Sequence, residues 1–467
     1  MGKQLFTVFI LGVITAALSF VASFCEVRSG ANRGYVQTGD ATYYYDDFGE
    51  EYVGFNVMPE DGTTKYFDEE THIMAKGETE ISGNKYLFDS EGVMQTGFQE
   101  VGGQKRYYSP DTGVMKTGWL KNNNEDYYLD ESTGDLLLGW QTIKGNKYYF
   151  SEEDGKVVKG LFELNDNKYY ADAETGVVAG GLQVIDGKQY FFDTDTGMMA
   201  KGWVEYEDEK YFFNEVTGEG LDGIVEKEDG KYGFIGGMMI RNKRAMADNH
   251  LYYFGEDGKV TREIDGNKPM VALTYDDGPS IYTNSIIDTF EKYNSKATFF
   301  IVGDRISWNE DPAKREGELG YQLGNHTYNH NRLTSLNADK KKEKLKGTDD
   351  ELMRVCGRKT TCLRPPEGRW DNELKQVCES PIILWSVDSR DWESRNANKI
   401  YNAIVGKVKD GDIVLMHDLY ESTADATKRI VPALIDAGFQ LVTVEEMGLL
   451  KQGGLQNGVV YYSIVKK

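Results

Sequence analysis

The stretch Val271–Ser280 reads VALTYDDGPS, and it decides the fold of the second half of the chain. Its apolar start predicts a buried strand, and its Gly-Pro end predicts a turn directly after two carboxylates, Asp276 and Asp277. Consecutive residues that leave a strand point in different directions, so one carboxylate can bind a metal ion while its neighbour handles a proton. An isolated Asp-Asp pair is more often part of a solvated turn, and the segments downstream decide between these two interpretations.

Four downstream segments supply the other groups that such a site needs. The first, GNHTYNH, places two histidines four residues apart, so on a helical turn both imidazoles would share one face and could bind one ion. Alone, this pattern is more often two ordinary polar residues. The residues of interest in the four segments are His326 and His330 in GNHTYNH, Arg364 and Glu367 in LRPPEGRW, Asp391 and Trp392 in WSVDSRDW, and Leu415 and His417 in IVLMHD.

One carboxylate and two imidazoles form the candidate metal-binding set, namely Asp277, His326 and His330. This set is too rich in nitrogen for Mg²⁺ or Ca²⁺ and suits Zn²⁺ or a similar transition metal. Three protein ligands leave positions open for water and substrate, as in catalytic sites. Asp276 is then the natural general base. His417 is the remaining histidine within a motif, so it is the candidate proton donor.

In this order and at these distances, the five segments resemble the signature motifs of the polysaccharide deacetylase family, the NodB-type enzymes of carbohydrate esterase family 4. The resemblance covers roughly residues 268 to 450 and implies a distorted (β/α) barrel with fewer than eight regular strands. It supports Asp276 as base and Asp277 as metal ligand. It also implies that Arg364 tethers the base, that Asp391 tunes the acid, and that Trp392 and Leu415 line the pocket for the acetyl methyl group.

One position departs from the family pattern. The third segment of active relatives usually reads Arg-Pro-Pro-Tyr-Gly, whereas this chain has Glu367 in place of the Tyr. In the family the backbone N–H at this position helps to hold the oxyanion, and a backbone group survives a side-chain change. The added carboxylate either favours a cationic or partly deacetylated glycan or reduces activity.

From about Tyr35 to Val260 the sequence repeats itself about every 20 to 22 residues, in eleven units. Each unit joins a Tyr- and Phe-rich strand to a second short strand through an Asp-x-x-Gly or Asp-x-x-Thr-Gly turn, which is hairpin chemistry. A single hairpin cannot bury its aromatic side chains, so neighbouring hairpins must stack and cover one another. The repeats therefore predict a β-hairpin solenoid.

These units resemble the cell-wall-binding repeats of Gram-positive surface proteins, which include choline-binding and glucan-binding types. Choline-binding members hold the ligand's ammonium in an aromatic cage. Here the Gly-Trp pair survives only at Trp119, Trp140 and Trp203, and Lys or another polar residue mostly precedes the Tyr pair, so a full set of cages is not expected. The three Trp side chains are candidates for stacking on sugar rings, and a core position between hairpins is the alternative for each.

Charge and termini limit the partners. Residues 31–260 contain 44 acidic and 22 basic side chains, so this half carries nearly all of the net charge of −23, which argues against nucleic acid as a partner. Residues 1–28 are apolar enough for a signal peptide or, if uncleaved, a membrane anchor. In an oxidising exterior Cys356 and Cys362 could pair and leave Cys378 free, but three buried thiols are an equal alternative.

The sequence thus predicts a multidomain protein with a signal peptide or anchor (1–28), a repeat solenoid (29–262), a deacetylase domain (263–452) and a tail (453–467). The expected function is an exported metal-dependent N-deacetylase, with zinc as the expected metal, at the cell surface of a Gram-positive-type bacterium. Its expected substrate is the N-acetylglucosamine of a wall glycan, peptidoglycan first, to which the repeats bind. The alternatives are a carbohydrate-binding adhesin whose barrel has lost activity and an O-acetyl esterase of the xylan type.

Overall fold

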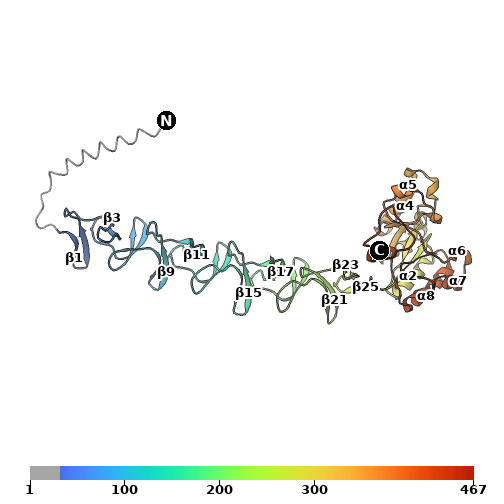
Figure 1. Cartoon of the computed structure of the whole chain (residues 1–467), viewed down its shortest axis with the longest axis horizontal. Helices are drawn as coiled ribbons and strands as arrows, with labels where there is room; N and C mark the ends of the chain where they lie inside the picture. Colours follow the sequence, from blue (N-terminus) through green and yellow to red (C-terminus); the bar gives the residue numbers. More distant parts are fainter. Residues whose placement is uncertain (1–31, 467) are drawn as a thin grey trace, which may run out of the picture. The chain divides into compact units, whose positions relative to one another are not determined.

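A computed structural model describes residues 32–466, and the predicted signal peptide or anchor, residues 1–28, lies outside this range. The described chain divides into two compact units. One runs up to Gln183 and includes Phe191–Ala200, and the other comprises Val184–Tyr190 and the chain from Lys201 onward. Figure 1 shows the hairpins in blue to green and the α/β part in yellow to red. No helix within the described range is long and apolar enough to cross a membrane.

The repeat region consists of short antiparallel hairpins, which confirms the predicted architecture. In one of them β12 (Gly139–Ile143) pairs with β13 (Asn146–Phe150) over its whole length, so only Lys144 and Gly145 form the turn. Both turn residues have positive φ, the geometry that matches a two-residue turn to the twist of its strands. The following turn leads only to an isolated bridge at Val157. The aromatic strand of this unit therefore pairs chiefly with the strand before it. The prediction had paired it with a strand after the Asp-x-x-Thr-Gly-type turn, and only the single bridge at Val157 corresponds to that pairing.

The other hairpins follow the same plan. They are β1 (Gly34–Thr38) with β2 (Ala41–Tyr45), β3 (Gly54–Val57) with β4 (Thr64–Phe67), β5 (Gly77–Ile81) with β6 (Asn84–Phe88), β8 (Gly97–Val101) with β9 (Gln104–Tyr108), β10 (Gly118–Asn122) with β11 (Glu125–Leu129), β14 (Gly160–Leu164) with β15 (Asn167–Ala171), β16 (Gly181–Ile185) with β17 (Lys188–Phe192), β18 (Gly202–Tyr206) with β19 (Glu209–Phe213), β20 (Gly223–Lys227) with β21 (Gly230–Ile235), and β23 (Arg244–Ala247) with β24 (His250–Phe254). Three further strands extend hairpins: β7 (Met94–Gln95), β22 (Met238–Met239) and β25 (Val260–Asp265).

Glycine turns hold neighbouring repeats in register. Gly155 has a φ of 77°, and any side chain there would meet Leu136 of the preceding repeat. The same relation joins Gly176 to Val157. The backbone N–H of Val157 also donates to the carbonyl of Asp126 at 2.9 Å, across repeats. Each repeat is therefore covered and bonded by its neighbours, as in other solenoids.

The α/β part is built on a parallel sheet. In it β26 (Met270–Asp276) lies between β27 (Thr298–Ile301) and β32 (Ile413–His417), and β28 (Gln322–Asn325) and β29 (Cys362–Leu363) follow β27. The continuous stretch from β30 (Ile382–Ile383) to β31 (Val387–Asp388) pairs with β29 at its start and with β32 at its end. This change of partner closes the sheet and confirms the predicted distorted (β/α) barrel. The short strands β33 (Gln440–Leu441) and β34 (Val460–Tyr461) pair with β26 and β30.

Helices connect the strands. They are α2 (Thr283–Lys292), η2 (Gly303–Trp308), α3 (Glu310–Glu318), η3 (Leu333–Ser335), α4 (Ala338–Cys356), η4 (Pro366–Gly368), α5 (Asn372–Val377), α6 (Asp391–Ser394), α7 (Ala397–Ile404), α8 (Glu421–Asp436) and α9 (Val444–Gln452), where η marks a 3-10 helix.

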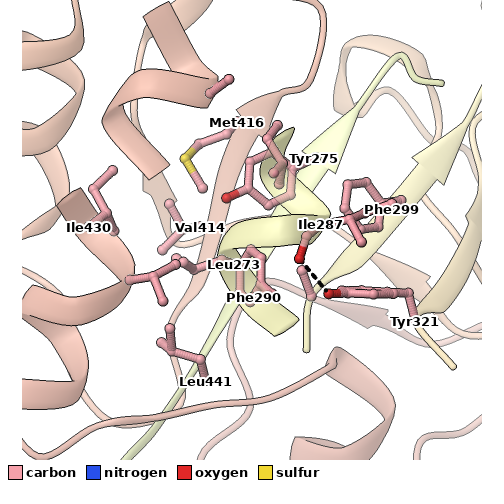
Figure 2. Close-up of a cluster of buried hydrophobic side chains, with 14 of the residues drawn as sticks. Leu273, Tyr275, Ile287, Phe290, Phe299, Tyr321, Val414, Met416, Ile430 and Leu441 are labelled. Carbon is pink, nitrogen blue, oxygen red and sulfur yellow. Dashed lines mark hydrogen bonds between the residues drawn. The ribbon is translucent and has the colours of Figure 1, made fainter. Parts of the chain in front are cut away.

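Side chains of β26 alternate between two buried clusters. Leu273 and Tyr275 pack with Phe290 of α2 under the outer helices, as Figure 2 shows. Ala272 belongs instead to the cluster inside the barrel. Because the side-chain period of a strand is two, Asp276 points to the same interior side at the carboxyl end of the strand.

The last hairpin packs against the barrel within the second unit. Leu251 and Ile264 are buried in the same cluster as the start of β26. Arg262 donates to the two carboxylate oxygens of Glu446 at 2.5 and 3.2 Å, and the hydroxyl of Tyr253 donates to the same carboxylate at 2.5 Å. The last repeat is thus tied to α9 by a buried ion pair as well as by apolar contact.

The three cysteines of the α/β part are free thiols, so the pairing of Cys356 with Cys362 is not formed. Cys362 and Cys378 are buried, and burial raises the pKa of both thiols. They pack as small apolar side chains.

Candidate active site

The register of the parallel strands gathers the predicted residues at the mouth of the barrel. Asp276, at the end of β26, lies directly opposite His417 at the end of β32. The strands β28 and β29 end side by side, one residue before His326 and Arg364. Carboxyl ends of parallel strands meet on one rim, so residues far apart in the sequence share one site.

Asp277, His326 and His330 form a cluster whose ligand atoms all lie within 4.8 Å of one another. The Oδ1 atom of Asp277 is 3.4 Å from Nε2 of His330 and 3.6 Å from Nε2 of His326. This oxygen is buried and has no hydrogen-bond partner. A buried carboxylate oxygen costs free energy unless it is paired, so an orphan oxygen facing two imidazole nitrogens fits a bound transition metal.

The two histidines reach this cluster by a route that differs from the prediction. The segment after β28 is a loop rather than a helical turn, and His330 and Thr327 have positive φ. This loop places the two imidazole centroids 5.0 Å apart. The i, i+4 spacing therefore identified the residues but not the backbone that presents them.

Buried partners set the protonation of the cluster. Nδ1–H of His326 donates to the carbonyl of Arg364 at 2.7 Å, which leaves Nε2 free to act as a ligand. Burial lowers the pKa of His326, which keeps the imidazole neutral. Burial opposes the ionisation of Asp277, but electrostatic interaction with the nearby imidazoles of His326 and His330 brings its pKa below the ordinary value. His326 and Asp277 thus favour the protonation states that metal ligands need.

A fully buried arginine holds Asp276. Arg364 donates to Oδ1 of Asp276 at 2.6 Å and to the hydroxyl of Thr274 at 2.8 Å through the same nitrogen. Its other N–H groups donate to the carbonyls of Ile383 and Leu384 at 3.1 and 2.9 Å. One oxygen of Asp276 is therefore fixed, while the other lies toward the ligand cluster and can accept a proton.

His417 is held by a second buried carboxylate. Its Nδ1–H donates to Oδ1 of Asp391 at 2.8 Å, and its backbone N–H donates to Oδ2 of Asp391 at 2.7 Å. Thr423 donates its hydroxyl to the same oxygen. Burial opposes a charge on His417, but the hydrogen bond and charge of Asp391 raise its pKa to about 9. At neutral pH the imidazole is thus protonated and can act as a proton donor.

Comparisons with known proteins agree with this geometry. The family model described as polysaccharide deacetylase matches residues 263–380. A peptidoglycan-N-acetylglucosamine deacetylase of Bacillus cereus is 35% identical over 189 residues, which cover 39% of this chain and 69% of that protein. The chain belongs to the polysaccharide deacetylase family.

Two further relatives match this chain over less than half of their own length. The peptidoglycan-N-acetylmuramic acid deacetylase PdaC of Bacillus subtilis is 36% identical over 190 residues, 40% of this chain and 41% of that protein. The peptidoglycan-N-acetylglucosamine deacetylase PgdA of Listeria monocytogenes is 36% identical over 178 residues, 38% of each protein. The chain thus spans about two fifths of the length of these relatives. A model described as choline-binding repeat matches residues 75–117, 96–138, 137–180 and 178–221.

In the deacetylase domain, the residues predicted to contact substrate differ in exposure. Glu367 lies at positive φ in η4, and its carboxylate accepts hydrogen bonds from Arg332 at 2.8 Å and Arg369 at 3.0 Å. The hydrogen bond from Arg332 lowers the pKa of Glu367. Its negative charge is therefore balanced by two guanidinium groups. Trp392 is 47% exposed, whereas Leu415 of β32 is buried.

Asp418 is a buried carboxylate of the deacetylase domain that the sequence analysis did not single out. Its carboxylate accepts a hydrogen bond from the Thr283 hydroxyl, and its backbone carbonyl accepts one from Ser280 at 2.5 Å. A side chain at Gly278 would overlap the carboxylate. Burial raises the pKa of Asp418 to about 7. The sequence did contain an indication of this residue, because an acidic residue directly follows His417 in IVLMHD.

The three candidate Trp side chains of the repeats are neither fully exposed surfaces for sugar stacking nor buried core residues. Trp119 is 45% exposed, and its ring lies edge-on to Tyr128 and Tyr148, with both centroids at 5.1 Å. Trp203 is 47% exposed, and Trp140 is half-buried. Each ring thus has one packed side and one accessible side, and a role in glycan binding stays a prediction.

Proposed function

We propose that the chain is an exported, metal-dependent N-deacetylase that removes acetyl groups from N-acetylglucosamine residues of peptidoglycan. One arrangement carries the proposal: the ligand cluster of Asp277, His326 and His330 is flanked by an arginine-held carboxylate, Asp276, and by a protonated imidazole, His417. Hydrolysis of an amide needs this combination of a base, an acid and an electrophile.

Asp277, His326 and His330 would hold a divalent transition metal, and two nitrogens with one carboxylate oxygen make zinc the expected one. When bound, such an ion polarises an acyl oxygen and lowers the pKa of water.

The protein side chains account for the proton transfers. Asp276 accepts a proton from the water whose oxygen forms the new bond to the acyl carbon, and Arg364 keeps this carboxylate in position. His417 donates its proton to the amide nitrogen as the carbon–nitrogen bond breaks. Asp391 stabilises the imidazolium before that transfer. The products are acetate and the free amine of the sugar.

The repeats supply the proposed location. The match to choline-binding repeats and the names of the relatives support a protein that stays on the wall glycan outside the cell. The acidic surplus of the repeat region agrees with a partner other than nucleic acid.

The test is release of acetate from peptidoglycan and from N-acetyl chitooligosaccharides by the zinc-loaded full chain. Chelator, Asp276→Asn and His417→Ala should each reduce the rate by at least about 100-fold, the usual scale of acid–base catalysis. His250→Ala, in the last hairpin, is the matched control and should leave the rate unchanged.

The outcomes separate the alternatives. Preferential hydrolysis of O-acetylated xylan would assign the chain to the esterases. A zinc-loaded protein that binds walls but releases no acetate would support the adhesin. Mass spectrometry of digested product then shows whether the glucosamine or the muramic acid residue has lost its acetyl group.

A further inference from the structure

Lys227 ends strand β20, and its ammonium group lies over aromatic rings. Its Nζ is 3.1 Å from the centroid of Phe212 and 5.5 Å from that of Trp203. Within the part of the chain that the structure describes, Lys227 takes part in no ion pair. Lysine usually keeps its head group in water or pairs it with a carboxylate, so the ring faces are here its chief partners.

The rings beneath Lys227 come from two successive hairpins. Trp203 belongs to β18, Phe212 to β19 and Tyr232 to β21. The centroid of Trp203 is 5.0 Å from that of Phe212 and 5.8 Å from that of Tyr232. We call these three rings the Trp203 surface. Several aromatic faces that converge from neighbouring elements attract organic cations.

The corresponding place in an earlier repeat holds an aliphatic side chain. Trp119 contacts Tyr128 and Tyr148 as Trp203 contacts Phe212 and Tyr232. There the last residue of the intervening strand β12 is Ile143, which is buried in one cluster with both tyrosines. Lys227 therefore stands where that earlier repeat has a buried aliphatic residue, and it brings a positive charge to the equivalent rings.

We propose that Lys227 is a built-in occupant of the Trp203 surface and excludes external organic cations, such as quaternary ammonium groups, from this repeat. The attraction between a cation and a ring face is short-ranged, so a tethered ammonium competes at high effective concentration with any free ligand. The repeats thus differ in their capacity to bind an external cation. The last residue of the intervening strand decides whether a side chain of the protein itself occupies the aromatic surface.

The first test counts choline sites per chain by equilibrium dialysis of the full chain with radiolabelled choline. Lys227→Ile, which copies Ile143, should bind one choline more than the wild type. Lys227→Ile combined with Trp203→Leu should lose that additional site. Lys210→Ile, in the neighbouring strand where the lysine faces Glu205 at 3.4 Å, is the matched control and should bind as the wild type does.

The second test does not depend on the formation of a new choline site. In the wild type labelled with ¹³C at lysine Cε, the methylene protons of Lys227 should resonate upfield of the other lysines because of the Phe212 ring current. Phe212→Leu should move that signal back. Equal numbers of choline sites in the wild type and Lys227→Ile, or a Lys227 signal at the position of exposed lysines, would overturn the proposal.

Discussion

Replacing Arg262 with Met tests whether the last hairpin is part of the deacetylase domain. The carboxylate of Glu446 is almost fully buried, and it receives hydrogen bonds from Arg262, from the Tyr253 hydroxyl and from the backbone N–H of Thr443. Without the guanidinium this carboxylate stays buried with two neutral donors. Loss of one partner from a buried ion pair typically costs about 3–5 kcal/mol, against a total stability of about 5–15 kcal/mol for a domain.

A surface pair at the same junction provides the control. Arg244 donates to Glu445 at 2.6 Å, but the two side chains are 45% and 37% exposed. Exposed pairs contribute about 0–1 kcal/mol, so Arg244→Met should be close to neutral. The two variants remove the same chemical group from the same three-stranded sheet, one from a buried ion pair and the other from an exposed one.

The effect also has a predictable pH dependence. Burial opposes the ionisation of Glu446, but Arg262 lowers its pKa below the ordinary value. A depressed carboxylate pKa gives stability that is present above the unfolded pKa and is lost as pH falls through the folded value. In Arg262→Met burial is opposed only by the two remaining neutral hydrogen bonds and raises the pKa of Glu446, so protonation relieves the unpaired charge. The difference between wild type and variant should narrow as pH falls from about 7 toward about 4.

The assay is urea unfolding of the full chain. Unfolding is monitored by the hydrogen exchange of amides in α9 and by the loss of acetate release. Arg262→Met should lower the midpoint for α9 strongly at pH 7. If Arg262→Met and Arg244→Met shift it equally, or if the difference does not change with pH, the reasoning from the buried pair is wrong.

Three further changes probe the site and the repeats. Asp391→Asn should lower the pKa of His417 from about 9, so the rate of acetate release should fall at lower pH than in the wild type, at least tenfold near pH 8. Gly155→Ala should destabilise the repeats by about 1–3 kcal/mol more than Gly145→Ala in thermal unfolding, because both have positive φ but only Gly155 faces a neighbouring repeat. Asp277→Asn should weaken zinc binding by at least about 100-fold in competition with a chromogenic chelator.

Each of these has a contrary outcome. An alkaline limit that Asp391→Asn does not move would remove His417 as the group that loses its proton there. Equal unfolding temperatures for the two glycine variants would show that register does not depend on the glycine contact. Unchanged zinc affinity in Asp277→Asn would place the metal elsewhere.

The sequence predicted the features that depend on residue type and period. The apolar run before the two carboxylates placed Asp276 at a strand end, and the residue types of Asp277, His326 and His330 suggested their common ligand role before any geometry was known. Together with the order of the motifs, they identified the family and the barrel.

The remainder depends on which strands become neighbours, and no local pattern encodes that. The stretch 382–388 changes its pairing partner midway, and the carbonyls of Ile383 and Leu384 within it accept hydrogen bonds from Arg364. Tertiary packing also determines three other features: the loop that carries His330, the burial of Asp418 and the ring contact of Lys227. Each of these features depends on contacts between elements that are far apart along the chain or belong to different repeats.

The contact between Gly155 and Leu136 limits how this protein can change in length. A chain with one complete repeat more or fewer still offers the glycines equivalent to Gly155, such as Gly134 and Gly176, an apolar side chain from the neighbouring repeat. A few residues inserted within a repeat would instead displace every later contact in that stack. The number of hairpin units can therefore grow or shrink by duplication or deletion of whole repeats, and such events leave each residue of the candidate site unaltered.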